Sequence, residues 1–222
     1  MPRSDARTTQ GATPRSRLRR RPDRGAYDFA ALAAVLDAQP LAHVGYLLDG
    51  QPFVTPTLQW REGERVYWHG SAASRMLKAV TGAPVCLTVS LFDAFVMARS
   101  AFNHSVNYRS VMLFGKAETI TDTAAKARHL ETFVDTLWPG RWAELRPMTT
   151  KEVKATSVLS MPIAEGAAKV RGGPPKADAA DYDQPVWAGL LPLATTVGAP
   201  QDDGRLLPGV TLPDYLRAFR VG

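Results

Sequence analysis

The feature that most constrains the fold is a run of short strand patterns joined by tight turns. Residues 41–48 and 52–60 are apolar or alternating segments, and Asp49-Gly50 between them is typical of a two-residue β-hairpin. A third strand is predicted over 65–69 after a four-residue turn. Because strands joined by hairpins run antiparallel, this pattern argues against a doubly wound parallel sheet.

The rest of the chain adds strands and inserts helices among them. Asp28, Ser74 and Asp122 each precede an amphipathic segment and are suited to cap a helix. The other predictions are strands over 84–92, 94–99, 108–121 (with a bulge at Gly115) and 158–170, a polar loop over 100–107 and a short helix over 151–156. This order predicts a mainly β (α+β) fold, a small antiparallel barrel with flanking helices.

The positive charge of the chain is concentrated at its start. The formal net charge is +6, and residues 1–25 hold eight arginines but only two acidic residues, so the remainder is neutral. We expect residues 1–25 to form a solvated, disordered basic tail, or alternatively an arm laid across a partner subunit. The neutral body needs no nucleic acid partner to explain its charge.

Membrane insertion, secretion and disulfide bonding are not expected. No apolar run approaches the ~18 residues of a membrane span, and the first 25 residues lack the apolar centre of a secretory signal. A single cysteine, Cys86, excludes an intrachain disulfide and a cysteine-based metal cluster, and it favours a cytoplasmic location. Amid apolar neighbours, Cys86 is interpreted as a buried thiol.

The amino-acid composition changes at Gly172. This change divides the part of the chain that follows residue 25 into two regions. Residues 172–222 hold seven of the 17 prolines and one apolar island, Val186 to Leu193. We therefore expect a barrel domain over 26–171 and an irregular C-terminal extension packed on that barrel.

The first stretch that could carry chemistry follows the third predicted strand. Ser71, Ser74, Arg75 and Lys78 lie in a small-residue turn and in the first turn of a helix. Free backbone N–H groups, hydroxyls and cations at a helix start favour an anion such as phosphate. The alternative is a capped amphipathic helix with two solvated cations.

The second stretch opens a long apolar strand. Arg109 and Ser110 stand at its start, where Arg109 is either an edge-strand charge or a second phosphate or substrate contact. His69, at the end of the third strand, is either a hydrogen-bonded barrel histidine or a contact to a cofactor or substrate. The histidines share no metal-ligand spacing, so no metal site is expected.

Taken together, these segments resemble the pyridoxamine 5′-phosphate oxidase-like superfamily of FMN-binding split β-barrels. The similarity is greatest to its flavin-nucleotide-binding or nitroimidazole-resistance-like branch. It is carried by the segments 54–58, 67–71 with Ser74, Arg75 and Lys78, 84–89, 108–117, 169–171 and 185–189.

The resemblance implies an antiparallel split β-barrel homodimer with FMN at the subunit interface. The phosphate would meet the cations and hydroxyls of both stretches, and the flavin ring would lie along one strand and against the end of another. The implied cofactor-binding residues are Thr55, Pro56, Thr57, Leu58, Trp68, His69, Gly70, Ser71, Ser74, Arg75, Lys78, Arg109 and Ser110. Arg171 and Trp187 are the implied substrate-side residues, with ordinary packing or solvation as the alternative.

The expected function is flavin-dependent oxidoreduction of a small molecule, with NAD(P)H as an electron source. His69 is the candidate catalytic residue, but the flavin itself supplies the electron and hydride chemistry. The C-terminal segment holds no histidine after His129, unlike the vitamin B6 oxidase of the superfamily, which argues against that substrate. Since some members of the superfamily bind haem or a deazaflavin, the alternative is a non-catalytic flavin- or haem-binding protein.

Overall fold

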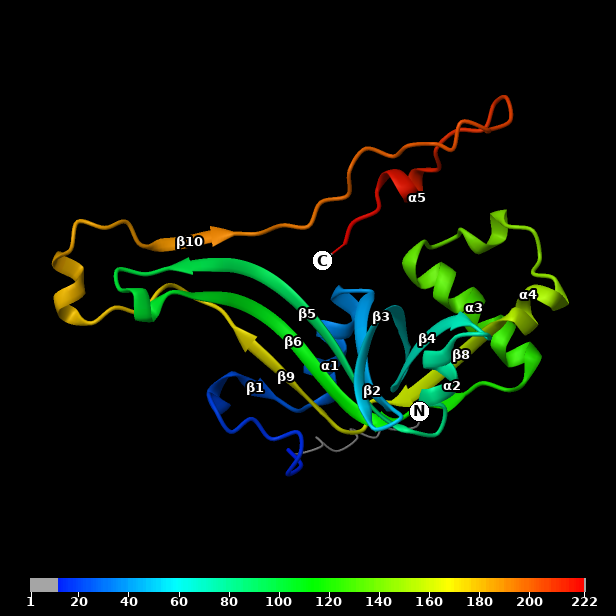
Figure 1. Cartoon of the computed structure of the whole chain (residues 1–222). Helices are drawn as coiled ribbons and strands as arrows, with labels where there is room; N and C mark the ends of the chain where they lie inside the picture. Colours follow the sequence, from blue (N-terminus) through cyan, green and yellow to red (C-terminus); the bar gives the residue numbers. More distant parts are fainter. Residues whose placement is uncertain (1–11, 222) are drawn as a thin grey trace, which may run out of the picture.

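The computed structural model describes residues 12–221 (Figure 1). Its strands are β1 (Gly25–Ala26), β2 (Leu41–Leu48), β3 (Gln51–Glu62), β4 (Arg65–Ser71), β5 (Pro84–Met97), β6 (Ser105–Lys116), β7 (Glu118–Thr119), β8 (Thr156–Pro162), β9 (Gly166–Arg171) and β10 (Gly189–Pro192). Its α-helices are α1 (Phe29–Ala38), α2 (Arg75–Val80), α3 (Thr123–Leu137), α4 (Thr150–Ala155) and α5 (Asp214–Arg217), and its 3-10 turns are η1 (Pro22–Arg24), η2 (Ala101–Asn103), η3 (Trp142–Glu144) and η4 (Ala179–Asp183). None of these helices is long and apolar enough to cross a membrane.

The strands form one antiparallel sheet in the order β1-β9-β6-β5-β2-β3-β4-β8-β7, and β10 pairs with β5. Figure 1 shows α1 near the middle of the molecule, where it packs on β3, β5, β6 and β9, and α3 and α4 against β8 at the side opposite the tip of the β5–β6 hairpin. The predicted mainly β split barrel with flanking helices is confirmed.

The turn and capping signals act as the sequence predicts. Asp49 and Gly50 both take positive φ angles, 52° and 75°, as a two-residue hairpin that matches the strand twist requires. Asp28, Ser74 and Asp122 each accept a hydrogen bond from a backbone N–H in the first turn of α1, α2 and α3.

Two apolar clusters hold the elements together. The larger fills the barrel, where Leu36 of α1 packs with strand residues such as Leu87 and Leu113. The smaller joins the outer side of β4 to α3 through Tyr67, Phe133 and neighbouring residues. The side chains of β4 therefore contact the core on one face and a helix on the other.

The β5–β6 hairpin is a long arm that extends away from α3 and α4 (Figure 1). Its irregularity lies between Phe92 and Ala94, so the bulge predicted at Gly115 is wrong. Gly115 pairs regularly with Val85, and it is small because a Cβ there would lie 2.6 Å from Met161. The strand begins at Ser105, so the predicted loop over 100–107 is shorter than expected.

The prediction of a disordered tail is wrong for residues 12–25, and residues 1–11 lie outside the described residues. Thr13 donates a hydrogen bond to the Glu165 carboxylate, and Arg15 forms an ion pair with the same group. Gly25 then pairs with Lys169 of β9. We call residues 12–25 the N-terminal arm; hydrogen bonding to a carboxylate and a strand edge fixes it.

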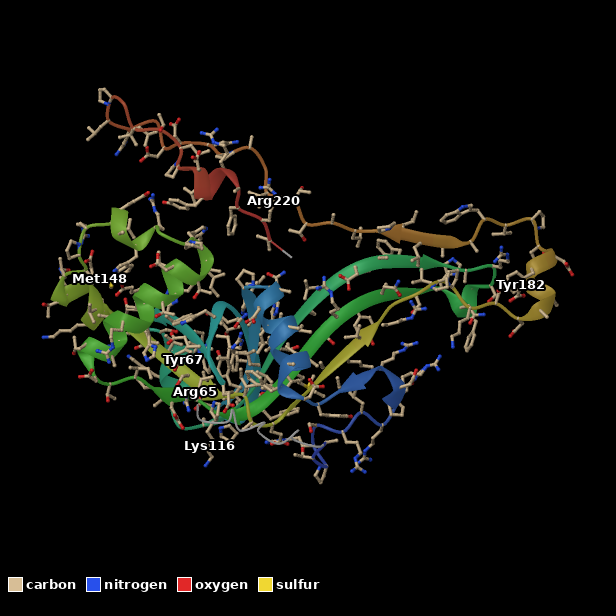
Figure 2. The ribbon with its side chains drawn as sticks, turned by 180° about the vertical axis from the view of Figure 1, so that it is seen from behind. Arg65, Tyr67, Lys116, Met148, Tyr182 and Arg220 are labelled. Atoms are coloured by element: carbon tan, nitrogen blue, oxygen red, sulfur yellow. The ribbon has the colours of Figure 1, made fainter. Side chains whose placement is uncertain are left out.

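The C-terminal extension packs on the rest of the chain only in places. β10 lengthens the sheet beside β5, and Tyr215 near the end donates a hydrogen bond to Glu144. Residues 194–211 between them are exposed along their whole length. Figure 2 shows the turn that carries Tyr182 at the far tip of the β5–β6 hairpin. The centroid of the Tyr182 ring lies 4.8 Å from the Arg99 guanidinium.

Candidate functional site

The turn between β4 and α2 is built as the sequence predicts. Ser71 Oγ accepts a hydrogen bond from the Ala73 N–H, and Ser74 Oγ accepts one from the Leu77 N–H. A Cβ on Gly70 would lie 3.0 Å from Leu77 Cδ1, so the glycine lets the helix approach the strand. Ser71 is exposed and Ser74 half-buried, so both hydroxyls stay near the surface.

Arg75 and Lys78 project from this helix into solvent. The Arg75 guanidinium lies over the ring of Phe53, 5.7 Å from its centroid. Within residues 12–221 neither cation has a carboxylate partner. Two uncompensated cations beside free hydroxyls and a helix start can hold a phosphate group.

The β3 segment beside this turn presents a mixed face. Pro56 and Leu58 are exposed, whereas Thr55 and Thr57 are half-buried and alternate with them. The Thr55 hydroxyl lies 3.3 Å from the Tyr46 hydroxyl on the paired strand. An exposed apolar strip next to a phosphate-sized site suits a flat aromatic ligand.

Trp68 and His69 point to opposite sides of β4. Trp68 is fully buried in the barrel core, so its side chain does not reach a ligand on the surface. The predicted contact between the Trp68 side chain and a flavin ring is therefore wrong, and only the Trp68 backbone could take part. His69 faces α3, with its ring 4.5 Å from that of Phe133 and 5.9 Å from that of Trp60.

The His69 imidazole has unused hydrogen-bonding capacity. Its Nδ1 is buried and has no hydrogen-bond partner among residues 12–221, and burial lowers the pKa of the imidazole. At neutral pH the ring is therefore uncharged, the form in which histidine can act as a metal ligand. His129 and His104 differ, since Nδ1 of His129 contacts Glu62 and Nδ1 of His104 contacts a backbone oxygen.

Arg109 and Ser110 do not join Arg75 within one chain. Arg109 makes a 2.8 Å ion pair with Asp93, which raises the pKa of the guanidinium, and the Ser110 hydroxyl donates to the Lys169 carbonyl. Arg109 lies opposite Leu91 on β5, whereas the hairpin under Arg75 joins β5 near Cys86. At the rise of a strand these positions are roughly 17 Å apart.

The two predicted substrate-side residues are in different surroundings. Arg171 is nearly buried, donates hydrogen bonds to Asn107 and to the Val106 carbonyl, and lines a cavity of about 530 Å³. Trp187 is 64% exposed and does not line that cavity.

The 530 Å³ cavity was not predicted. Its cations come from the N-terminal arm, from β9 and from the segment after it, and the sequence alone placed the arm in solvent. The sequence signal for a fixed arm was the pair Leu18 and Tyr27, which flank the arginines. In the structure the Leu18 N–H donates a hydrogen bond to the Tyr27 hydroxyl. Elsewhere, the described residues contain no group of three His, Cys, Asp or Glu side chains able to hold a metal ion.

The sequence of the chain matches the model of a known protein family. The family model for pyridoxamine 5′-phosphate oxidase matches residues 28–170. The chain belongs to this family. The predicted resemblance is thereby confirmed, although no curated protein matches the chain.

Solved structures extend the similarity over almost the whole chain. The flavocytochrome Anf3 from Azotobacter vinelandii is 51% identical, with 95% of this chain and 98% of that chain covered and a TM-score of 0.91. An FAD and haem binding protein from Mycobacterium smegmatis is 37% identical over 88% of this chain and 97% of its own, with a TM-score of 0.84. A protein described as a 5-nitroimidazole antibiotic resistance protein from Bacteroides thetaiotaomicron shares the fold at 22% identity, covering 66% and 86% of the two chains with a TM-score of 0.55.

Proposed function

We propose that this protein is a flavin- and haem-binding redox protein, a flavocytochrome that passes electrons between a small donor and its bound cofactors. The observation that carries the proposal is 51% identity to the flavocytochrome Anf3 over nearly the full length of both chains. The second relative, named for FAD and haem, supports the same pair of cofactors.

The residues at the start of α2 suit the phosphate of a flavin. Arg75 and Lys78 lack a carboxylate partner in the described chain, and the hydroxyls of Ser71 and Ser74 lie beside them. A phosphate carries a charge near −2 at neutral pH and needs such donors. FMN has this phosphate as a monoester, whereas in FAD it is part of a pyrophosphate and carries a single negative charge; the sequence pattern favours FMN, and the name of the 37% identical relative favours FAD.

His69 is the side chain best placed to hold haem iron. Its buried, unpartnered Nδ1 marks an imidazole whose bonding the protein alone does not complete. The neighbouring rings of Trp60 and Phe133 provide an apolar setting for the imidazole. A proximal histidine is a common haem ligand, and haem would supply one-electron chemistry there. The role proposed for His69 is thus iron ligation.

A second copy of the chain completes the proposed site. Large apolar side chains are exposed on the outer sides of β3, β5, β6 and β9, namely Val54 (67%), Leu58 (39%), Phe92 (45%), Met112 (45%) and Val170 (43%). Apolar groups clustered at this density on a sheet indicate a protein interface. In a homodimer, Arg109 and Ser110 of one copy can approach the α2 turn of the other, which the single chain does not allow.

An absorbance spectrum of the purified protein tests the proposal. We expect flavin bands and a Soret band, with mass spectrometry after heat release identifying the flavin as FMN or FAD. Bleaching of the flavin bands by NAD(P)H without air supports an oxidoreductase, whereas a flavin that no nicotinamide donor reduces supports the non-catalytic alternative. A colourless protein from haem- and flavin-replete cells would refute the proposed function.

The proposal also covers quaternary structure and location. We expect a homodimer by light scattering, and Met112→Glu at the exposed sheet face to shift it towards monomer with loss of flavin. Cys86 is a half-buried free thiol whose pKa is raised by burial, and an unreactive thiol of this kind fits the proposed cytoplasmic location.

A further inference from the structure

A concentration of positive charge lies in the 530 Å³ cavity between the N-terminal arm and β9, away from α2. Six cationic side chains from three segments line it: Arg20, Arg21, Arg24, Lys169, Arg171 and Lys176. No acidic residue is among its lining residues. Segments distant in sequence thus converge on one concave, basic surface.

The charge of this cavity is not neutralised within the part of the chain that the structure describes. None of the six cations forms an ion pair with a described carboxylate. Arg171 is only 9% exposed, and its pKa is lowered by burial and by repulsion from Arg24 and Arg21. Cations held together at this cost are suited to a multivalent anion.

The arm that supplies three of these arginines is fixed in place before any ligand arrives. Gly25 pairs with Lys169, and the Leu18 N–H donates a 2.9 Å hydrogen bond to the Tyr27 hydroxyl. A Cβ on Gly25 would lie 2.7 Å from Leu18 Cδ1, so the chain is tightly packed there. A preorganised cation cluster binds an anion with less ordering cost than a flexible tail does.

We propose that this basic cavity binds the adenosine diphosphate half of a dinucleotide. Four arginines and two lysines exceed what one phosphate needs and match two adjacent phosphates. A volume of 530 Å³ lies within the range of small-molecule sites. Phe102, 95% exposed at the cavity wall, offers a face on which a purine ring can stack.

Two dinucleotides share this chemistry, and the inference rests on the proposed redox function for its biological meaning. One is a nicotinamide dinucleotide that delivers electrons, and the other is FAD, whose adenosine end would extend beyond the flavin site. ADP is the simplest probe because it contains the common half of both molecules.

The test compares two double variants of the full-length protein. Arg20→Ala with Lys176→Ala removes two exposed cations from two different walls of the cavity. Arg17→Ala with Arg19→Ala removes the same charge from exposed positions of the same arm that do not line the cavity. ADP and NADPH are titrated by calorimetry, and the flavin released by heat is identified and quantified by mass spectrometry.

Two results support the proposal and separate the sources. In the first result, ADP and NADPH bind the wild type, and their affinity for the cavity variant is at least about tenfold lower than for the control variant. This result indicates a site for the nicotinamide donor. A wild type that binds no ADP but releases FAD, with at least about tenfold less FAD in the cavity variant than in the control, indicates that FAD occupies the cavity.

Equal ADP affinity and equal FAD content in the two variants, or a wild type that neither binds ADP nor releases FAD, would overturn the proposal. Failure of the redox function is read separately, from the absence of flavin and Soret bands. ADP titration of that same colourless protein still reports on the cavity.

Discussion

Replacing Gly166 by alanine tests whether the close approach of β9 to β6 at this residue sets the position of β9. Gly166 is buried and pairs with Leu113 on β6. A Cβ there would lie 2.6 Å from Leu113 Cδ2 and 2.7 Å from the carbonyl oxygen of Met112. A backbone oxygen cannot rotate away, so the β6–β9 pair itself must shift.

The expected cost follows from this overlap. Forcing one extra carbon into a packed core costs about 1–3 kcal/mol, and the lower unfolded-state entropy of alanine returns about 0.4–1 kcal/mol. The net destabilisation is about 1–2 kcal/mol, or a fall in Tm of roughly 2–8 °C for a chain of this size.

Gly172→Ala is the matched control. Gly172 follows β9 and does not take a positive φ, and a Cβ added there would have no described atom within 4 Å. The free energy of unfolding of the Gly172→Ala variant should therefore equal that of the wild type or exceed it slightly. Both variants are unfolded in urea and followed by circular dichroism, at equal protein concentration and cofactor content because ligands and partners stabilise the folded state. A Gly166→Ala midpoint as high as that of Gly172→Ala would show that the contact does not hold β9.

Three further predictions concern the site and pH. Arg75→Ala should weaken flavin binding by about 1.5–3 kcal/mol in equilibrium titrations, and Lys116→Ala, at another exposed cation, should not; equal affinities would remove Arg75 from the site. His69→Gln should abolish the Soret band while His43→Gln keeps it, and a full band in His69→Gln would assign the iron to another ligand. Hydrogen bonds from Arg146 and Thr149 lower the pKa of Glu152 to about 2, so its carboxylate stabilises the fold above about pH 4.5, and this contribution is lost as the pH falls towards 2. Glu152→Gln should therefore lower the urea midpoint at pH 7 and converge with wild type near pH 2, and a difference that does not depend on pH would contradict this.

Local signals were sufficient to predict most of the fold. The Asp49-Gly50 hairpin and the Asp28 and Asp122 caps depend on residues within a few positions of each other, so the sequence displays them directly. The bulge predicted at Gly115 is wrong because a glycine in a strand can indicate either a bulge or a close approach of another element. Only the position of Met161, in a different strand, distinguishes the two.

The site was harder to predict because its geometry depends on strand register. Alternation places Trp68 and His69 on opposite faces of β4, but it does not say which face is the core. Arg109 looked free in the sequence, whereas its partner Asp93 is 16 residues away and becomes a neighbour only through the β5–β6 pairing. The arginines of the N-terminal arm looked solvated for the same reason, since Glu165 anchors the arm from a distant turn.

The two incomplete features of the single chain have one common explanation. Arg75 has no anionic partner, Arg109 lies roughly 17 Å away along the sheet, and the intervening sheet exposes Met112 and other apolar side chains. An exposed apolar sheet is costly in water, whereas the solvated cations at the start of α2 are only part of a phosphate site. A second copy that covers the sheet can bring its own Arg109 to the first copy's Arg75, and because two cations repel each other, the negatively charged flavin phosphate between them stabilises the contact. On this argument, flavin binding and dimer formation are thermodynamically linked, and each strengthens the other by the same factor.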